Sequence, residues 1–312
     1  MTLWTSVLAA ASAGVLICCT AAEPAGDPGE TTPEPGTADV APSSPPPPAP
    51  SSPLPSGLNL PTDTGGPTSP TTAPVPGTST GRSIWATSGG KLLAFTSDAP
   101  SKVTVRDVAG LGQGEQLVGL AFRKTGTLYA VGTTSRLFSV TTATATVTTV
   151  STAPFAALLD GTSFGFDFDP VSDLARVTSS TSKNIRVEAT NGTVTNVDGL
   201  VRYAAGDANA GAVPLAFAVA YAADGTGYAI DATTGNLVRI LDSYSGQIQT
   251  IGALGQTITG TAGFDIAGKD AFAALRVGAV TSLYAVDLTT GKITSMGKIG
   301  DGGPVTGLAI QP

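Results

Sequence analysis

The chain has 312 residues, of which 12% are charged and none is histidine, and its formal net charge is −7. All 16 Lys and Arg residues lie at or beyond Arg82, together with 17 of the 23 acidic residues, so this part of the chain is nearly neutral. A nearly neutral domain without clustered cations excludes nucleic acid as a partner, and the lack of histidine excludes a Ser-His-Asp triad and a histidine-ligated zinc.

The chain opens with an almost unbroken apolar run, Leu3–Cys19, followed by small residues up to Ala22. This pattern predicts an export signal over residues 1–22, because the run falls short of the roughly 20 apolar residues that a membrane span needs. The two cysteines end the run, and a lipoprotein signal would place its diacylated cysteine at Cys19; cleavage near Ala22 and an uncleaved anchor are the alternatives. We expect an exported protein of the cell envelope or extracellular space that meets a membrane only through this lipid anchor.

Residues 23–81 are dominated by Pro, Ser, Thr and Gly and contain 17 of the 23 prolines. Such a segment buries too little apolar surface to fold, so we predict a disordered, extended tether. Residues 82–312, in contrast, are rich in Val, Ile, Ala, Thr and Gly, which predicts an all-β domain.

A five-residue anchor recurs through this domain, at spacings of 46, 53, 45 and 44 residues. The copies are Val118–Phe122, Phe164–Phe168, Phe217–Tyr221, Ala262–Ile266 and Thr306–Ile310. Each alternates large with small side chains, as expected for a packed strand, and three strand-like runs follow each of the first four. Four strands per unit of about 45 residues are typical of a β-propeller blade.

No strands follow the fifth anchor, and three unpaired ones precede the first, at Ile84–Ser88, Lys91–Thr96 and Lys102–Val108. The sequence therefore predicts a five-bladed β-propeller in which the C-terminal strand completes the N-terminal blade and closes the ring. A two-sheet sandwich would leave both the period and the leftover strands unexplained.

Four segments carry a family resemblance: Phe164–Arg176, Ala205–Gly211, Ala262–Gly268 and Leu283–Gly291. They resemble a bacterial exported family known only as a domain of unknown function. The resemblance covers most of residues 84–310. It implies the propeller fold and export, and it implies no activity.

Asp167 and Asp265 stand at the fourth anchor position, where the other three copies have alanine. Innermost strands line the central channel of a propeller, so the two carboxylates predict a ligand site or a site for a hard cation such as Ca²⁺. The alternative is that each carboxylate caps a backbone amide in the neighbouring blade.

Two loops offer weaker candidates. Asp169-Pro170, followed by Asp173 and Arg176, is typical of an Asx-type turn with an Asp–Arg contact, and Asp169 is also a candidate ligand-binding residue. The insert at 206–211 places Asp207 and Asn209 where they could hold calcium, but it lacks the full alternating acid pattern of an EF-hand, and an ordinary ordered loop is the preferred explanation.

These features favour an exported binding module whose partner is an unknown protein or polysaccharide at the cell surface. We assign no catalytic residue. The alternative is a glycan hydrolase that uses the channel carboxylates, because paired carboxylates are what that chemistry requires.

Overall fold

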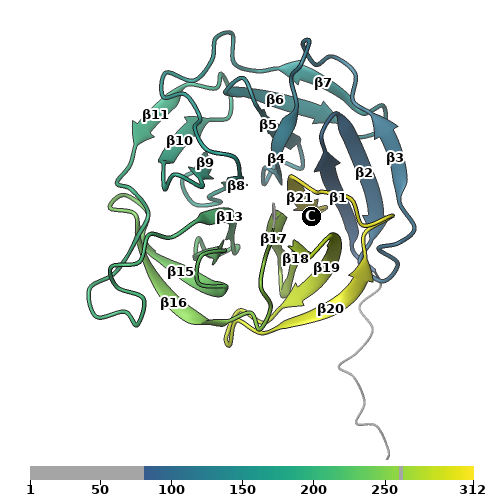
Figure 1. Ribbon diagram of the computed structural model, residues 1–312. Coiled ribbons are helices and arrows are strands. Elements are labelled where there is room, and N and C mark those ends of the chain that lie inside the picture. The colour runs from purple at the N-terminus through teal and green to yellow at the C-terminus, as the bar shows by residue number, and fades with distance from the viewer. Residues whose placement is uncertain (1–80, 260–262) are drawn as a thin grey trace, which may run out of the picture. The chain divides into compact units, whose positions relative to one another are not determined.

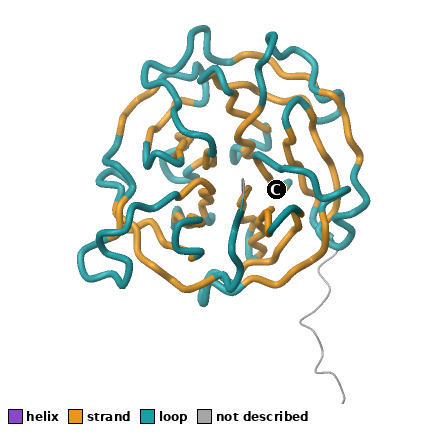
Figure 2. Tube along the Cα trace, in the orientation of Figure 1, coloured by secondary structure: helices purple, strands orange, loops and turns teal. Residues whose placement is uncertain are grey.

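The computed structural model describes residues 81–259 and 263–312, which form five β-sheets arranged as blades around a central axis (Figure 1). Strands and loops make up this whole part of the chain (Figure 2). Among the described residues, no helix is long and apolar enough to cross a membrane. The prediction of a five-bladed β-propeller with four strands per blade is confirmed.

Each blade is an antiparallel sheet whose strands run in order from the axis outward. Blade 1 contains β21 (Gly307–Ile310), β1 (Ser83–Ser88), β2 (Lys91–Thr96) and β3 (Thr104–Asp107). Blade 2 contains β4 (Leu117–Phe122), β5 (Leu128–Gly132), β6 (Arg136–Thr141) and β7 (Thr146–Thr149). Blade 3 contains β8 (Phe164–Phe168), β9 (Leu174–Ser179), β10 (Asn184–Glu188) and β11 (Val194–Val197).

Blade 4 contains β13 (Ala216–Tyr221), β14 (Gly227–Asp231), β15 (Asn236–Asp242) and β16 (Gln247–Ala253). Blade 5 contains β17 (Gly263–Ala267), β18 (Asp270–Val277), β19 (Val280–Val286) and β20 (Ile293–Lys298). A two-residue strand, β12 (Arg202–Tyr203), pairs in parallel with β16 and so covers the outer edge of blade 4. The five anchors form the innermost strands, as their position in the repeat predicts.

The ring closes through β21, which pairs antiparallel with β1 from Ile84–Ile310 to Thr87–Gly307. The strand from the end of the chain thus supplies the innermost strand of blade 1, so no blade lacks its inner partner (Figure 1). This confirms the predicted closure and removes the strand edges that an open ring would expose.

Small residues at the second anchor position allow neighbouring inner strands to approach closely. A Cβ atom added at Gly119 would lie 2.5 Å from Cβ of Phe166 in the next blade. One added at Gly307 would lie 2.8 Å from the backbone nitrogen of Leu120, again in the next blade. The small residue at the second position of an anchor therefore packs against the large residue at the third position of the next anchor. This packing explains the alternation of small and large residues in the sequence.

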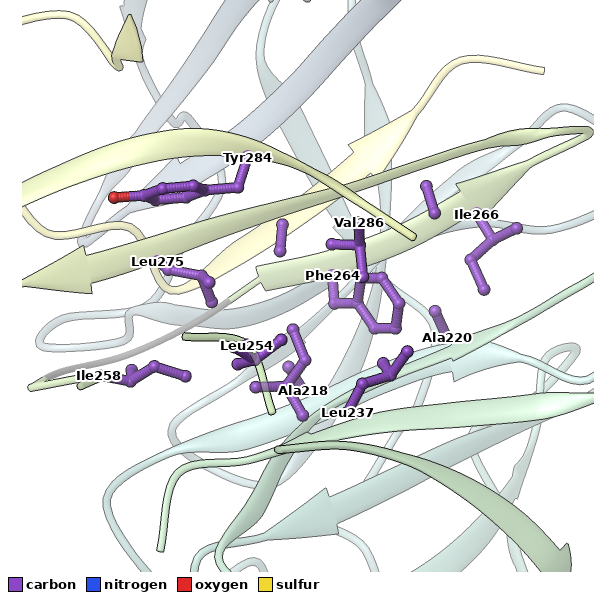
Figure 3. Packing of buried hydrophobic residues seen from close by; sticks show 13 residues of the cluster. Ala218, Ala220, Leu237, Leu254, Ile258, Phe264, Ile266, Leu275, Tyr284 and Val286 are labelled. Atoms are coloured by element: carbon purple, nitrogen blue, oxygen red, sulfur yellow. The ribbon is translucent and has the colours of Figure 1, made fainter. Parts of the chain in front are cut away.

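The hydrophobic core lies between blades, where the faces of adjacent sheets meet. Between blades 4 and 5, for example, Ala218, Ala220 and Leu237 pack with Phe264 and Ile266 (Figure 3). Leu237 and Leu275 of this cluster are fully buried. Each blade thus depends on its neighbours for burial.

Candidate ligand site at the channel mouth

A cavity of about 360 Å³ lies where the inner strands of all five blades end. The last residue of each of these strands lines it: Phe122, Phe168, Tyr221, Ala267 and Ile310. At the opposite ends of the inner strands, the described residues leave only about 10 Å³, among Gly119, Gly165, Ala218, Gly263 and Gly307. We call the first space the mouth cavity. It is a blind pocket, because a space of the second size passes no ligand.

Asp167 and Asp265 both line the mouth cavity, and both use their carboxyl oxygens in the same way. Oδ1 of Asp167 accepts from the amide of Phe168 (2.7 Å), and Oδ2 accepts from the amide of Tyr221 in the next blade (2.7 Å). The Oδ1 atom of Asp265 likewise accepts from Ile266 (2.7 Å), and its Oδ2 atom from Ile310 in the next blade (2.6 Å).

This geometry is the one expected if each carboxylate caps an amide of the neighbouring blade. The amides that are capped belong to inner strands, whose axial edges have no further strand to pair with. Asp167 thus joins blades 3 and 4, and Asp265 joins blades 5 and 1. No group of three or more acidic, histidine or cysteine side chains among the described residues is placed to hold a metal. The calcium site remains a prediction.

Burial governs the ionisation of the two carboxyl groups. It raises the pKa of Asp265 to about 7, although the two backbone amides that donate to it act in the opposite direction. Burial also raises the pKa of Asp167 well above its usual value, and the negative charge of Asp265 raises it further. At neutral pH the floor of the mouth cavity therefore carries less negative charge than two aspartates would suggest.

Cationic side chains line the rim of the mouth cavity. Arg82 donates to Asp270 (2.8 Å) and to the carbonyl of Ala267 (2.9 Å), so it spans blades 1 and 5. Lys124 of blade 2 lies 3.8 Å from Asp173 of blade 3, and its side chain is 52% exposed. The sequence interpretation missed both cations, although each lies within two residues of a strand of the repeat pattern.

Asp173 makes an ion pair, but with a different arginine from the one near it in sequence. Arg123 binds it with both Nε (2.9 Å) and Nη2 (2.6 Å), and this hydrogen bonding lowers the pKa of Asp173. Arg176 instead binds Asp198 (3.0 Å) inside blade 3. The expected contact of Arg176 with this turn was wrong, because Arg176 belongs to β9 and points away from it into the seam with blade 4.

The Asx-type turn at Asp169 is confirmed. Its Oδ1 atom accepts from the amide of Val171 (2.9 Å) and its Oδ2 atom from Oγ of Ser172 (2.8 Å). Asp169 does not line the mouth cavity. Its role as a ligand-binding residue therefore gains no support from its position.

Asp207 and Asn209 lie together in the loop before blade 4, away from the mouth cavity. The carboxyl oxygens of Asp207 accept from the amide (2.7 Å) and the hydroxyl (2.8 Å) of Thr250. Asn209 donates to the same hydroxyl (2.9 Å). These bonds fasten the loop to β16, as in an ordinary structural turn. Cys19 lies outside the described residues.

Residues 91–309 match a family model described as Domain of unknown function (DUF4394). No curated protein matches the chain. Solved structures with a similar arrangement include a nidogen/laminin complex, which is 14% identical with a TM-score of 0.46 over 74% of this chain and 99% of the other. Virginiamycin B lyase from Staphylococcus aureus is 12% identical (TM-score 0.41; 69% of each chain). The periplasmic gluconolactonase of Pseudomonas aeruginosa is 14% identical (TM-score 0.40; 72% of this chain and 69% of the other).

The family match runs from β2 to the closing strand β21. It covers the same part of the chain that carries the sequence resemblance. The chain therefore belongs to the DUF4394 family.

Proposed function

We propose that this protein is an exported binding module that holds a polar group of a cell-surface partner in the mouth cavity. The observation that carries the proposal is the mouth cavity itself: a blind pocket at the meeting point of five inner strands, with charged side chains at its rim. Its volume of about 360 Å³ falls within the range of about 300–1,000 Å³ that is typical of ligand pockets.

The rigid construction of the site supports binding. Backbone strands of all five blades form its wall, and the two carboxyl groups on its floor are each held by two amides. A pocket that is rigid before the ligand arrives loses little conformational entropy on binding. The apolar leader Leu3–Cys19 supports export, and modification of Cys19 would retain the propeller at a membrane surface.

The proposal is tested by filling the mouth cavity. Ala223 lines it and is exposed in a turn, so Ala223→Trp should block the pocket without disturbing the core. Ala279 is an exposed turn alanine of the β18–β19 hairpin, outside the mouth cavity, and Ala279→Trp is the matched control. Binding of the full-length protein to a glycan array and to intact cells should disappear in Ala223→Trp and persist in Ala279→Trp. Equal binding by both variants would place the ligand elsewhere.

A glycan hydrolase is the second candidate, and one observation favours it. Asp167 and Asp265 line the same cavity, and a carboxyl group with a pKa of about 7, such as that of Asp265, suits a general acid. Against it, all four carboxyl oxygens already accept backbone amides. Measuring reducing ends released from a panel of polysaccharides separates the two candidates: turnover that Asp167→Asn abolishes would establish the hydrolase.

A further inference from the structure

The backbone amide of Phe122 differs from the four equivalent amides of the other inner strands. The last anchor residues of blades 3, 4, 5 and 1 each donate their amide to Asp167 or Asp265. Phe122 of blade 2 has no such carboxylate, because alanine occupies the fourth anchor position both in its own strand and in the preceding one. The amide of the next residue, Arg123, donates to Thr127 of the same blade (2.9 Å), so the Phe122 amide points to the axial side of β4.

Two cations flank this amide along the rim. Lys124 contacts the carbonyl of Pro170 at 3.4 Å and Asp173 at 3.8 Å, and Asp173 is already bound by both nitrogens of Arg123. Lys124 and Arg123 therefore share a single carboxylate, so this group of three charged side chains keeps one net positive charge. On the other flank, Arg82 uses Nε and Nη2 on Asp270 and Ala267, which leaves Nη1 without a hydrogen bond in the described part of the chain.

These donors share one arc of the mouth, from the seam of blades 5 and 1 through blade 2 to the seam of blades 2 and 3. We call it the donor arc; it consists of Arg82, the Phe122 amide and Lys124. A carboxylate has the charge and the acceptor atoms that such an arc can bind. The floor offers complementary acceptors, because each carboxyl oxygen of Asp167 and Asp265 uses one lone pair on a backbone amide and keeps a second for a hydroxyl group.

We propose that the mouth cavity binds a hydroxylated carboxylic acid, the terminal uronic acid residue of an acidic polysaccharide, with its carboxylate on the donor arc and its hydroxyls toward Asp167 and Asp265. We choose a terminal residue because a chain cannot thread through a pocket that is closed at its far end, whereas a chain end can enter it. This inference rests on the proposed function, and it specifies the ligand of the same site.

Calorimetric titration of the full-length protein with matched sugars tests the inference. Glucuronate and galacturonate should bind at least about tenfold more tightly than glucose and galactose, as a charge-assisted hydrogen bond would provide. Lys124→Met should remove most of this preference. Lys102 is exposed in a turn outside the mouth cavity, so Lys102→Met should leave the preference intact. An oligouronide should bind with one site per chain if only the terminal residue enters.

The outcomes separate this inference from the proposed function. Neutral and acidic sugars that bind equally well, and that Ala223→Trp excludes, would overturn the choice of ligand and retain the binding module. A preference for uronates that survives Lys124→Met would also overturn the inference, because the donor arc would then not be the recognising element. Failure of every saccharide and every surface glycan to bind would overturn both.

Discussion

Asp265 and Asp167 each accept hydrogen bonds from two inner strands of the propeller. Each satisfies an amide of its own strand and an amide of the next blade, at edges that have no strand to pair with. The cost is the burial of an ionisable group, which raises the pKa of both. Their contribution to stability therefore depends on pH.

The first prediction concerns that dependence. The pKa of Asp265 is about 7 in the folded protein and 3.8 as its usual value, so the folded state binds more protons than the unfolded state between these pH values. The stabilisation associated with protonated Asp265 is thus complete below about pH 4 and is lost as pH rises through 7. Thermal melting from pH 4 to 8 should show Asp265→Asn gaining stability relative to the unsubstituted protein as pH rises.

The surface carboxylate of Asp287 provides the control. Turn amides and hydroxyls lower its pKa from the usual 3.8, so its titration lies mainly below this range. Asp287→Asn should therefore leave the slope between pH 4 and 8 unchanged. A constant difference in melting temperature between Asp265→Asn and the unsubstituted protein would show that Asp265 does not titrate there.

A second prediction decides between the two interpretations of these carboxylates. If they hold Ca²⁺, the melting temperature rises with calcium and falls with a chelator, because a ligand of the folded state stabilises it by mass action. If they only cap amides, calcium and chelator leave the melting temperature unchanged. The hydrogen bonds to all four oxygens lead us to expect the second result. A calcium-dependent rise that Asp167→Ala with Asp265→Ala removes would establish the metal site.

Asp167 and Asp265 could be identified from the sequence by comparing the repeats. The comparison shows a carboxylate at the position where the other three copies have alanine. The sequence did not predict the hydrogen bonds of their carboxyl oxygens. The two-residue period of a strand shows which residues share a face, but not whether that face lies toward the central axis or toward the neighbouring blade. Lys124 and Arg82 were missed for a related reason. They lie outside the strands, where no periodicity marks them.

At the scale of elements, the strands were predictable to within a few residues. The run Lys91–Thr96 coincides with β2, and the run Ile84–Ser88 starts one residue after the start of β1, because alternation and turn residues mark the ends of both. The parallel strand β12 was not predicted. Two residues show no period, and its pairing with β16 depends on a segment more than 40 residues away in the chain.

The third prediction tests the close approach of inner strands. Gly119→Ala would place a Cβ atom 2.5 Å from Cβ of Phe166, so one of the two strands must shift. We expect a loss of about 1–3 kcal/mol, as is typical of overpacking. Gly90→Ala is the control, because nothing lies within 4 Å of its Cβ position. Chemical denaturation of both variants measures the difference in their free energies of unfolding. Equal stability would mean that the inner strands of blades 2 and 3 can move apart without cost.

For the whole molecule, closure by the last strand leads to the fourth prediction. Deleting Gly303–Pro312 removes Val305, Leu308 and Ile310, which are all buried. At roughly 1.5–3 kcal/mol each, their loss is comparable to a total stability of about 5–15 kcal/mol. We expect the truncated protein to aggregate or to melt without cooperativity.

The control for this truncation removes only Gln311 and Pro312, which are exposed and follow β21. That shorter deletion should retain a cooperative transition near that of the complete chain. A protein lacking residues 303–312 that melts in the same way would show that the ring does not need its closing strand.

The pairing of β1 with β21 also constrains when the protein can fold. Ile84 pairs with Ile310 of the closing strand, so the blade that leaves the ribosome first is the last to be completed. Blades 2 to 5 each draw their strands from one continuous stretch and can assemble as they emerge. Until β21 has been synthesised, blade 1 keeps an unpaired strand edge, and in this interval the nascent chain is most exposed to aggregation and to proteases.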